Sequence, residues 1–188
     1  MAAYPSHLEH ERHLADGRKV LIRPIRPNDE AGERVFFDCL SGESKQLRFM
    51  KFVKAVNEKL IHFFTHIDYD KHMAFVCEHE GRLIGEARYG AIPGGASCEF
   101  GVVIADDWHK SGIAGLLMQA LINAAQASGF ETMEGHVLRT NSAMLRFVRA
   151  LGFALEPEPY EPTMVRVAKK LRSTSAASAR NAGEISTG

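Results

Sequence analysis

Apolar side chains recur with a helical period over residues 113–124 of this chain. The apolar positions are Ile113, Leu116, Leu117, Ala120, Leu121 and Ala124. Their spacing of about 3.6 residues predicts an amphipathic helix with one buried face. A strand-like apolar run, residues 100–104, comes before it, and a loop with two glycines, residues 109–115, joins the two. We expect this strand, loop and helix to organise the fold.

Two hairpins are predicted in the first half of the chain. Residues 7–25 and residues 73–90 each hold two strand-like runs, separated by Asp-Gly in the first case and by Glu-Gly in the second. Such turn residues between two runs are typical of hairpins.

Two helices are predicted between these hairpins. Asn28 or Asp29 can cap the first, which should end near residue 40 at a Ser-Gly pair, and Asn57 can cap the second, over residues 58–66. The run after the Ser-Gly pair alternates apolar and basic side chains, and we assign it to no element.

The second half of the chain continues with a predicted strand over residues 131–138. The strand, helix and strand then form a crossover unit, for which we expect parallel strands and a right-handed connection. Asn141 should start the last helix and Gly152 should end it. Two short strands, residues 153–155 and 164–167, are expected to follow.

We expect one domain over residues 1–172 and a disordered tail over residues 173–188. A chain of 188 residues is long enough for one domain with a proper core. The tail holds a single large apolar residue, Ile185, and cannot bury enough surface to order itself. The elements predict an α/β (α+β) fold, with a mixed, mostly antiparallel sheet and helices on its faces.

Composition narrows the classes of partner. Lys+Arg and Asp+Glu both count 23, so no basic excess points to nucleic acid. No apolar run approaches the roughly 20 residues that span a bilayer, and the first residues lack the apolar core of a secretion signal. The three cysteines are widely spaced and odd in number, which favours reduced thiols and a cytoplasmic location.

The loop and the strand before it carry the candidate chemistry. A loop of small residues that opens a helix leaves backbone N–H groups unpaired, and such a site suits a phosphate or pyrophosphate. The same pattern also occurs where backbones simply pack closely. The carboxylate of Glu99 lies on the strand, eleven residues before Lys110. The residues of the loop are His109, Lys110, Ser111, Gly112, Ile113, Ala114 and Gly115.

Two motifs in this order resemble those of the GNAT family of N-acetyltransferases. The family loop, Gln/Arg-x-x-Gly-x-Gly/Ala, matches residues 109–114 except at His109, which replaces Gln or Arg. The second motif, an Asn that opens a helix ending in Leu-Gly-Phe, matches Asn141 and residues 151–153. The resemblance covers residues 18–170. It implies a sheet of about six to seven strands and about four helices, with a central parallel pair splayed to hold CoA.

A closer resemblance links the chain to the catalytic domain of bacterial protein-lysine acetyltransferases of the Pat type. It is carried by residues 68–70, 73–76, 85–89 and 99–100. Proteins of that type often have a fused regulatory or acyl-CoA-synthetase-like domain, for which this chain has no room.

The resemblance implies acetyl-CoA as the co-substrate and assigns its binding residues. The pyrophosphate would lie on the amides of residues 110–115, at the positive end of the helix dipole. The pantetheine arm would pair with the strand backbone, where an amide would hold the thioester oxygen and the oxyanion. These strand residues are Val102, Val103 and Ile104. Asn141 would lie near the pantetheine, with Met144 and Phe147 against the CoA arm.

An acceptor amine needs a base, because a lysine amine with a pKa of about 10.4 is mostly protonated at neutral pH. Glu99 is the candidate, since the Pat-type resemblance puts a catalytic glutamate there. Many GNAT members also have a tyrosine that protonates the leaving thiolate. Counting from Asn141, that position is Val148, so we name no general acid.

Other polar residues favour structural explanations. His7, His10 and His13 lie on a predicted strand edge, and His62 and His66 are four apart on a helix with no acidic or cysteine partner at ligand spacing, so we expect no metal. Cys98 fits a small buried residue better than a nucleophile. Asp68 and Asp70 can either attract a cationic acceptor or cap a turn, and the sequence favours neither.

The sequence therefore predicts a cytoplasmic acetyl-CoA-dependent N-acetyltransferase that transfers the acetyl group directly to an amine, with protein lysine as the leading acceptor. A small-molecule amine is the alternative acceptor, because one fold serves many substrates. A non-catalytic acyl-CoA-binding sensor is the alternative from another class. We expect neither nucleic acid nor a membrane as a partner, and a homodimer stays open.

Overall fold

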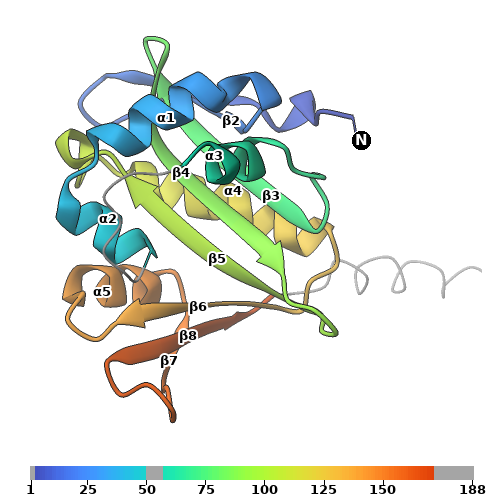
Figure 1. Ribbon diagram of the computed structural model, residues 1–188, viewed down its shortest axis with the longest axis vertical. Helices are drawn as coiled ribbons and strands as arrows, with labels where there is room; N and C mark the ends of the chain where they lie inside the picture. The colour runs from blue at the N-terminus through green and yellow to red at the C-terminus, as the bar shows by residue number, and fades with distance from the viewer. Residues whose placement is uncertain (1–2, 50–56, 172–188) are drawn as a thin grey trace, which may run out of the picture.

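The computed structural model describes residues 3–49 and 57–171, which form one sheet of eight strands in the order β1-β2-β3-β4-β5-β6-β8-β7 (Figure 1). Neighbouring strands are antiparallel except β5 and β6, which are parallel as the crossover unit predicts. The tail expected from residue 173 onward lies outside the described residues. The strands are β1 (His10–His13), β2 (Lys19–Pro24), β3 (His72–His79), β4 (Arg82–Ala91), β5 (Ser97–Ile104), β6 (Thr132–Leu138), β7 (Ala154–Pro157) and β8 (Met164–Lys170).

Five α-helices of the described residues cover the two faces of the sheet. In Figure 1, α1, α2 and α3 lie in front of the sheet and α4 lies behind it, where it packs on β3, β4 and β5. No helix in the described part of the chain is long and apolar enough to cross a membrane. The helices are α1 (Glu30–Cys39), α2 (Gly42–Phe49), α3 (Glu58–Thr65), α4 (Ile113–Ala127) and α5 (Ser142–Ala150), with 3-10 turns η1 (Ser6–Leu8), η2 (Pro27–Asp29) and η3 (Asp106–Trp108).

The mixed α/β class is confirmed. The described residues form eight strands and five α-helices, where the resemblance implies about six to seven strands and about four helices. The additional helix is α2, which starts at the Ser-Gly pair where the sequence predicts only a break. Its first turn is capped from far away: the Asp106 carboxylate accepts hydrogen bonds from the Ser41 amide at 2.8 Å and from the Ser44 hydroxyl at 2.7 Å. A cap that comes from η3 leaves no local signal.

Two predicted helix caps are confirmed by their hydrogen bonds. The Asn57 side chain accepts a bond from the Leu60 amide at 2.9 Å at the start of α3, and the Asn141 side chain accepts one from the Met144 amide at 3.1 Å at the start of α5. Asp29 precedes α1 but makes no such cap.

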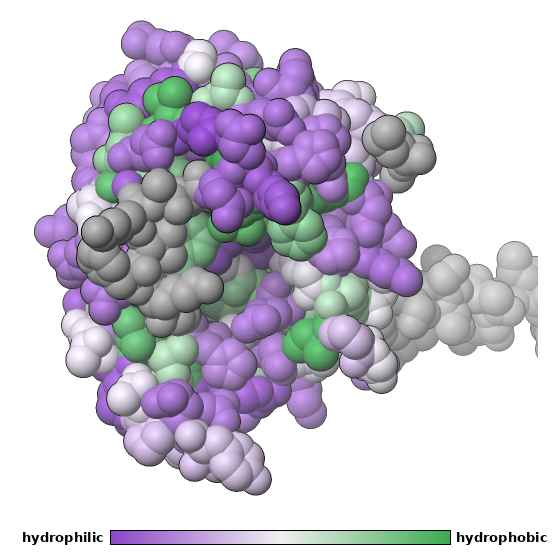
Figure 2. All heavy atoms as spheres, viewed as in Figure 1, coloured by the Kyte–Doolittle hydropathy of each residue, from purple (hydrophilic) through white to green (hydrophobic). Residues whose placement is uncertain are grey.

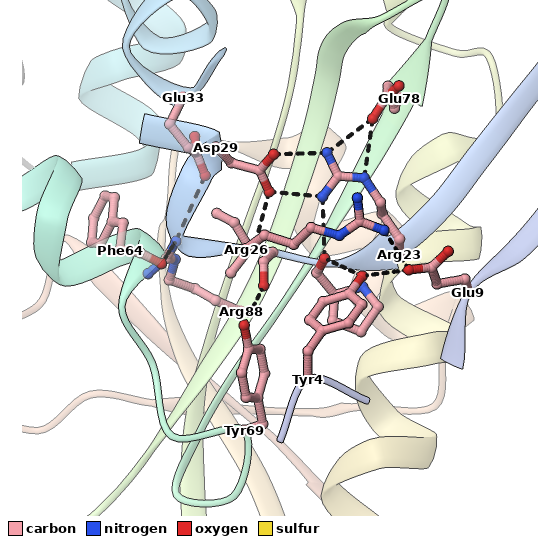
Figure 3. Close-up of polar contacts among 12 residues, drawn as sticks. Tyr4, Glu9, Arg23, Arg26, Asp29, Glu33, Phe64, Tyr69, Glu78 and Arg88 are labelled. Atoms are coloured by element: carbon pink, nitrogen blue, oxygen red, sulfur yellow. Dashed lines mark hydrogen bonds and ion pairs between the residues drawn. The ribbon is translucent and has the colours of Figure 1, made fainter. Parts of the chain in front are cut away.

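Asp29 instead belongs to an ionic cluster that fixes the start of α1 against the sheet (Figure 3). The guanidinium of Arg23, which is 4% exposed, bonds both oxygens of Asp29 at 2.7 and 2.8 Å, and it contacts Glu78 on β3 at 2.9 Å. The Tyr69 hydroxyl donates to the Ile25 carbonyl at 2.8 Å and anchors the loop after α3 to the same region.

The pairing of β5 with β6 ends early. The two strands pair only over residues 97–99 and 132–134, and Phe100 and Gly135 would form the next pair. The ring of Phe100 lies against Gly135, where an added Cβ would be 2.9 Å from a ring carbon. The ring also packs on Phe153, with 5.1 Å between centroids. Glycine at position 135 therefore leaves room for this ring at the point where the two strands part.

Candidate active site

A cleft of about 970 Å³ opens where β5 and β6 part. Its walls come from β5, the loop before α4, α5, β6 and the near-face helices α2 and α3. Figure 2 shows this face hollowed between the part with α1 and α3 and the part with α5, with apolar residues inside the hollow and hydrophilic residues around it. The splayed pair thus forms the groove that the sequence analysis predicts.

Every residue predicted to act in catalysis or cofactor binding lies along this one cleft. Because these residues come from four separate elements, the fold must assemble them, and it does so. They are Glu99, Val102, Val103, Ile104, His109, Lys110, Ser111, Gly112, Ile113, Ala114, Gly115, Asn141, Met144 and Phe147.

The loop before α4 presents free backbone donors to the cleft. Within the described residues, the N–H groups of Lys110, Gly112 and Ala114 donate to no other group. Lys110 and Gly112 have φ angles of 66° and 90°, a left-handed backbone that glycine adopts without strain. An added Cβ at Gly115 would meet nothing within 4 Å, so its backbone is open to a ligand. This arrangement of donors suits a diphosphate.

Only every second residue of β5 has its backbone N–H and C=O groups on the edge that β6 leaves free. The Ala105 amide bonds the Ile84 carbonyl of β4, so in the unbroken antiparallel register the backbone of Val103 also faces β4. The N–H and C=O groups of Val102 and Ile104 face the side that β6 has left. The His109 ring nitrogen Nε2 lies 3.2 Å from the Ile104 carbonyl, so this residue supports the strand end through a backbone contact.

Helix α5 forms the opposite wall. The side-chain oxygen Oδ1 of Asn141 accepts the hydrogen bond of the helix cap, so its side-chain nitrogen Nδ2 stays available to the cleft. Val148, at the usual tyrosine position, is fully buried, and Tyr89 is the one tyrosine among the described residues lining the cleft. The Tyr89 hydroxyl donates to the Asp70 carbonyl at 3.1 Å, and burial raises its pKa to about 12. Neither residue supplies a general acid.

Glu99 is the last residue of β5 that pairs with β6, at the point where these two strands part. Its carboxylate oxygen Oε1 lies 3.3 Å from Nδ1 of His136 on β6. Nε2 of the same ring lies 3.2 Å from Oε2 of Glu158. A carboxylate, an imidazole and a second carboxylate therefore form a continuous chain from the cleft to the loop after β7. Burial raises the pKa of the neighbouring Cys98 thiol to about 12, so it stays protonated at neutral pH and is unsuited to be a nucleophile.

A second histidine lies across β4 from Glu99. The register aligns His72, Gly90 and Glu99 on three adjacent strands, and the His72 ring lies beside Gly90. Asp68 accepts hydrogen bonds from the His72 amide at 2.7 Å and contacts the ring nitrogen Nδ1 at 3.0 Å. Burial alone would raise the pKa of Asp68, but these hydrogen bonds hold it below its usual value. Asp68 therefore caps the turn before β3 and orients His72.

A buried set of charges lies between α1, α2 and the sheet. The Arg88 guanidinium bonds both oxygens of Glu86 at 2.7 and 2.6 Å, and Arg48 lies 3.8 Å from the same carboxylate. Burial opposes ionisation of Glu86, but Arg88 outweighs it and lowers the Glu86 pKa to about 2. Glu33 faces Arg88 at 3.9 Å (Figure 3), and within the described residues its oxygens accept no hydrogen bond. Burial and the negative charge of Glu86 raise the pKa of Glu33 well above its usual range.

Replacing Glu33 by glutamine should make folding stability less dependent on pH. A raised pKa keeps the proton on Glu33 in the folded protein, whereas the unfolded chain releases it above about pH 4.3. The wild type therefore loses folding free energy as pH rises toward neutrality, and the variant does not. Thermal unfolding measured from about pH 4.5 to pH 7.5 should show that the stability of the variant increases relative to that of the wild type as pH rises. A constant difference across this range would contradict the raised pKa, and the exposed substitution Glu131→Gln serves as the control.

Sequence reasoning missed the half of the cleft nearest the helices. Arg48 and Phe63 line it from α2 and α3, and His72 and His136 line it from β3 and β6. One signal was available for His136: in a parallel pair that aligns Glu99 with Glu134, the residue two positions later lies on the same face. No local pattern marks Arg48 or Phe63 as part of a site.

Comparisons with known proteins agree with this geometry. The model of the acetyltransferase (GNAT) family matches residues 43–153. An acetyltransferase of Pseudomonas aeruginosa is 38% identical over 156 residues, which are 81% of this chain and 84% of that protein. Acetyltransferase Pat of Mycolicibacterium smegmatis is 29% identical over 140 residues, and the match covers 72% of this chain but 41% of Pat.

The fold agrees as well. The crystal structure of the GNAT domain of S. lividans PAT matches with a TM-score of 0.83 at 26% identity, covering 90% of this chain and 100% of that domain. The family match, the relatives and the eight-stranded sheet with its splayed pair lead to one conclusion: this chain is an acetyltransferase of the GNAT family.

Proposed function

We propose that this enzyme transfers the acetyl group of acetyl-CoA directly to an amine, and that the acceptor is a lysine side chain of a protein. The GNAT family uses acetyl-CoA. The observation that carries the proposal is the position of Glu99: it lies at the fork of β5 and β6 and lines the same cleft as the donor loop before α4 and as α2 and α3.

The residues suggest how the co-substrate binds. The diphosphate can bind the free amides of Lys110, Gly112 and Ala114, and the open space at Gly115 gives it room. The pantetheine arm can pair with the free edge at Val102 and Ile104, with Met144 and Phe147 on its other side. An amide of that edge would hold the thioester oxygen and stabilise its negative charge during the reaction.

The chemistry is an acyl transfer with one proton to remove. The amine nitrogen attacks the thioester carbon, the carbon–sulfur bond breaks, and CoA leaves as a thiolate. Glu99 accepts the proton of the attacking amine, directly or through water. His136 and Glu158 support this role, because their contacts at 3.3 and 3.2 Å form a route that can carry the proton away from Glu99. A thiol with an ordinary pKa of about 8.5 leaves without strong help from an acid.

Two features favour a protein lysine over a small amine. The chain is similar in sequence to Acetyltransferase Pat of Mycolicibacterium smegmatis and in fold to the GNAT domain of S. lividans PAT, and the Pat-type resemblance implies a protein lysine as acceptor. Phe63, at 57% exposed, stands at the edge of the cleft, where it can pack on the aliphatic part of a lysine that reaches in from another protein. We place the reaction in the cytoplasm, since the cysteines Cys39, Cys77 and Cys98 are free thiols.

One assay distinguishes a protein-lysine acetyltransferase from a small-amine acetyltransferase and from a non-catalytic acyl-CoA-binding sensor. The enzyme is incubated with isotopically labelled acetyl-CoA and either a bacterial protein extract or a panel of small amines, and products are identified by mass spectrometry. We expect label on lysine side chains. Label on a small amine alone would overturn the lysine assignment, and binding of acetyl-CoA with no transfer to either would overturn the enzymatic function in favour of a sensor.

A further inference from the structure

Three metal-ligand side chains converge between α1 and α3, outside the catalytic cleft. His62 lies on α3, His66 follows one turn later as the residue that caps the end of this helix, and Glu30 is the first residue of α1. Oε1 of Glu30 lies 2.8 Å from Nδ1 of His62 and 3.5 Å from Nδ1 of His66. The ligand atoms of the three residues all lie within 4.8 Å of one another. The two helices lie side by side in Figure 1.

The sequence did not reveal this set because its carboxylate comes from another helix. Glu30 precedes His62 by 32 residues, so no spacing rule connects them. The structure therefore corrects the expectation that this histidine pair has no acidic partner.

The three side chains present one convergent set of electron-pair donors. The imidazole rings stack with 3.7 Å between centroids, so both Nδ1 atoms lie near the same Glu30 oxygen. An Nδ1 atom without a proton turns its lone pair toward that oxygen, and a metal ion between the two atoms would bind both. An Nδ1–H group would instead donate a hydrogen bond to the oxygen.

The distances suit a metal ion. Zinc binds imidazole nitrogen at about 2.0–2.1 Å and carboxylate oxygen at about 2.0–2.2 Å, so tetrahedral ligand atoms stand about 3.3–3.5 Å apart. The Glu30–His66 distance of 3.5 Å agrees with this value, whereas the Glu30–His62 distance of 2.8 Å is shorter, so a bound ion would move these two side chains slightly apart. Two imidazoles and one carboxylate are the ligand types that zinc and its neighbours accept, whereas magnesium and calcium prefer oxygen ligands. The side chains are partly exposed, which leaves a position for water or another ligand.

We propose that Glu30, His62 and His66 bind a divalent transition-metal ion such as zinc and thereby link α1 to α3. The positive side chain near this site does not prevent binding of a cation. Arg34 lies one turn after Glu30, but it is paired with Glu58 at 3.0 Å, so its charge is largely compensated. Because Phe63 and Phe64 lie on α3 between the two histidines, the ion would also hold one wall of the acceptor side of the cleft in position.

The competing explanation is a simple ion pair. Nδ1 of His66 also lies 3.2 Å from the His62 carbonyl and 3.0 Å from the Thr65 hydroxyl, so a proton on this nitrogen would have partners within its own helix. A protonated His62 would then satisfy Glu30 alone. This arrangement binds no metal, and the two explanations are separated by titration.

The experiment uses the whole chain, freed of metal with a chelator and then dialysed. Calorimetric titration with Zn²⁺ should show one site per chain, Mg²⁺ should show none, and Zn²⁺ should raise the midpoint of thermal unfolding. The substitutions Glu30→Gln, His62→Gln and His66→Gln should each weaken Zn²⁺ binding by about tenfold or more. The matched control His10→Gln/His13→Gln removes two exposed histidines of β1 and should leave it unchanged.

Acetyl-CoA binding serves as the check that each variant is folded. A Zn²⁺ isotherm that is unchanged in all three site variants would overturn the proposal, as would loss of binding in the β1 control. Absence of any Zn²⁺ binding by the wild type would establish the ion pair instead. None of these readouts depends on acetyl transfer, so failure of the metal site and failure of the proposed function are distinguishable.

Discussion

The substitution Glu99→Gln should lower kcat for acetyl transfer by about a hundredfold or more, with the Kd for acetyl-CoA close to that of the wild type. Glutamine keeps the shape of the side chain beside His136 but cannot accept a proton. The acceptor amine would then have to lose its proton to solvent. The variant should therefore recover activity as pH rises, because the free amine becomes more abundant toward its pKa of about 10.4. Steady-state kinetics at saturating acetyl-CoA across a range of pH provides the measurement.

The control for this prediction is Glu131→Gln, which removes an exposed carboxylate just before β6 and outside the cleft. It should leave kcat unchanged. Wild-type turnover in the Glu99 variant would show that another group, of which His72 is the nearest candidate across β4, removes the proton. A large loss of acetyl-CoA affinity would instead indicate that Glu99 serves binding.

The second large effect is expected at Gly115, where stability and affinity should change in opposite directions. Leucine at this position replaces glycine inside α4, and this improves helix propensity by about 0.8 kcal/mol. No neighbouring atom lies within 4 Å of the new Cβ, so the side chain can be accommodated. It would, however, occupy the space in front of the free amides. We expect a roughly hundredfold weaker Kd for acetyl-CoA, equivalent to about 2.7 kcal/mol.

Calorimetric titration with acetyl-CoA and thermal unfolding of the free protein measure the two quantities separately. The matched control is Gly42→Leu, at the first residue of α2, where an added Cβ also meets nothing within 4 Å and which does not line the cleft. The Kd of the Gly42→Leu variant for acetyl-CoA should equal that of the wild type. If Gly115→Leu also binds acetyl-CoA normally, the diphosphate does not lie on this loop.

The sequence predicts well the elements that line one half of the cleft, because these elements depend on local features. The helical period of residues 113–124 and the glycine loop before it lie in one continuous stretch. Asn141 likewise caps its own helix, so its position follows from its neighbours in the chain. A site built from backbone groups at element ends can be inferred wherever the element ends themselves can be inferred.

The half of the cleft lined by α2 and α3 could not be predicted in the same way, since it depends on contacts between distant segments. Helix α2 is capped by Asp106, and Arg48 and Arg88 both lie against the carboxylate of Glu86 on β4. The partner of His62 is Glu30 on another helix. Each of these pairs becomes visible only after the helices are placed on the sheet, and the sequence pattern carries no trace of them.

The early end of the β5–β6 pairing has a consequence for how ligands enter. Because the two strands pair only as far as Glu99 and Glu134 in the free protein, a thioester can reach the β5 edge beyond that point without breaking strand hydrogen bonds. None of its contact energy is then spent on separating the strands, so that energy is available for affinity and for alignment of the reacting atoms.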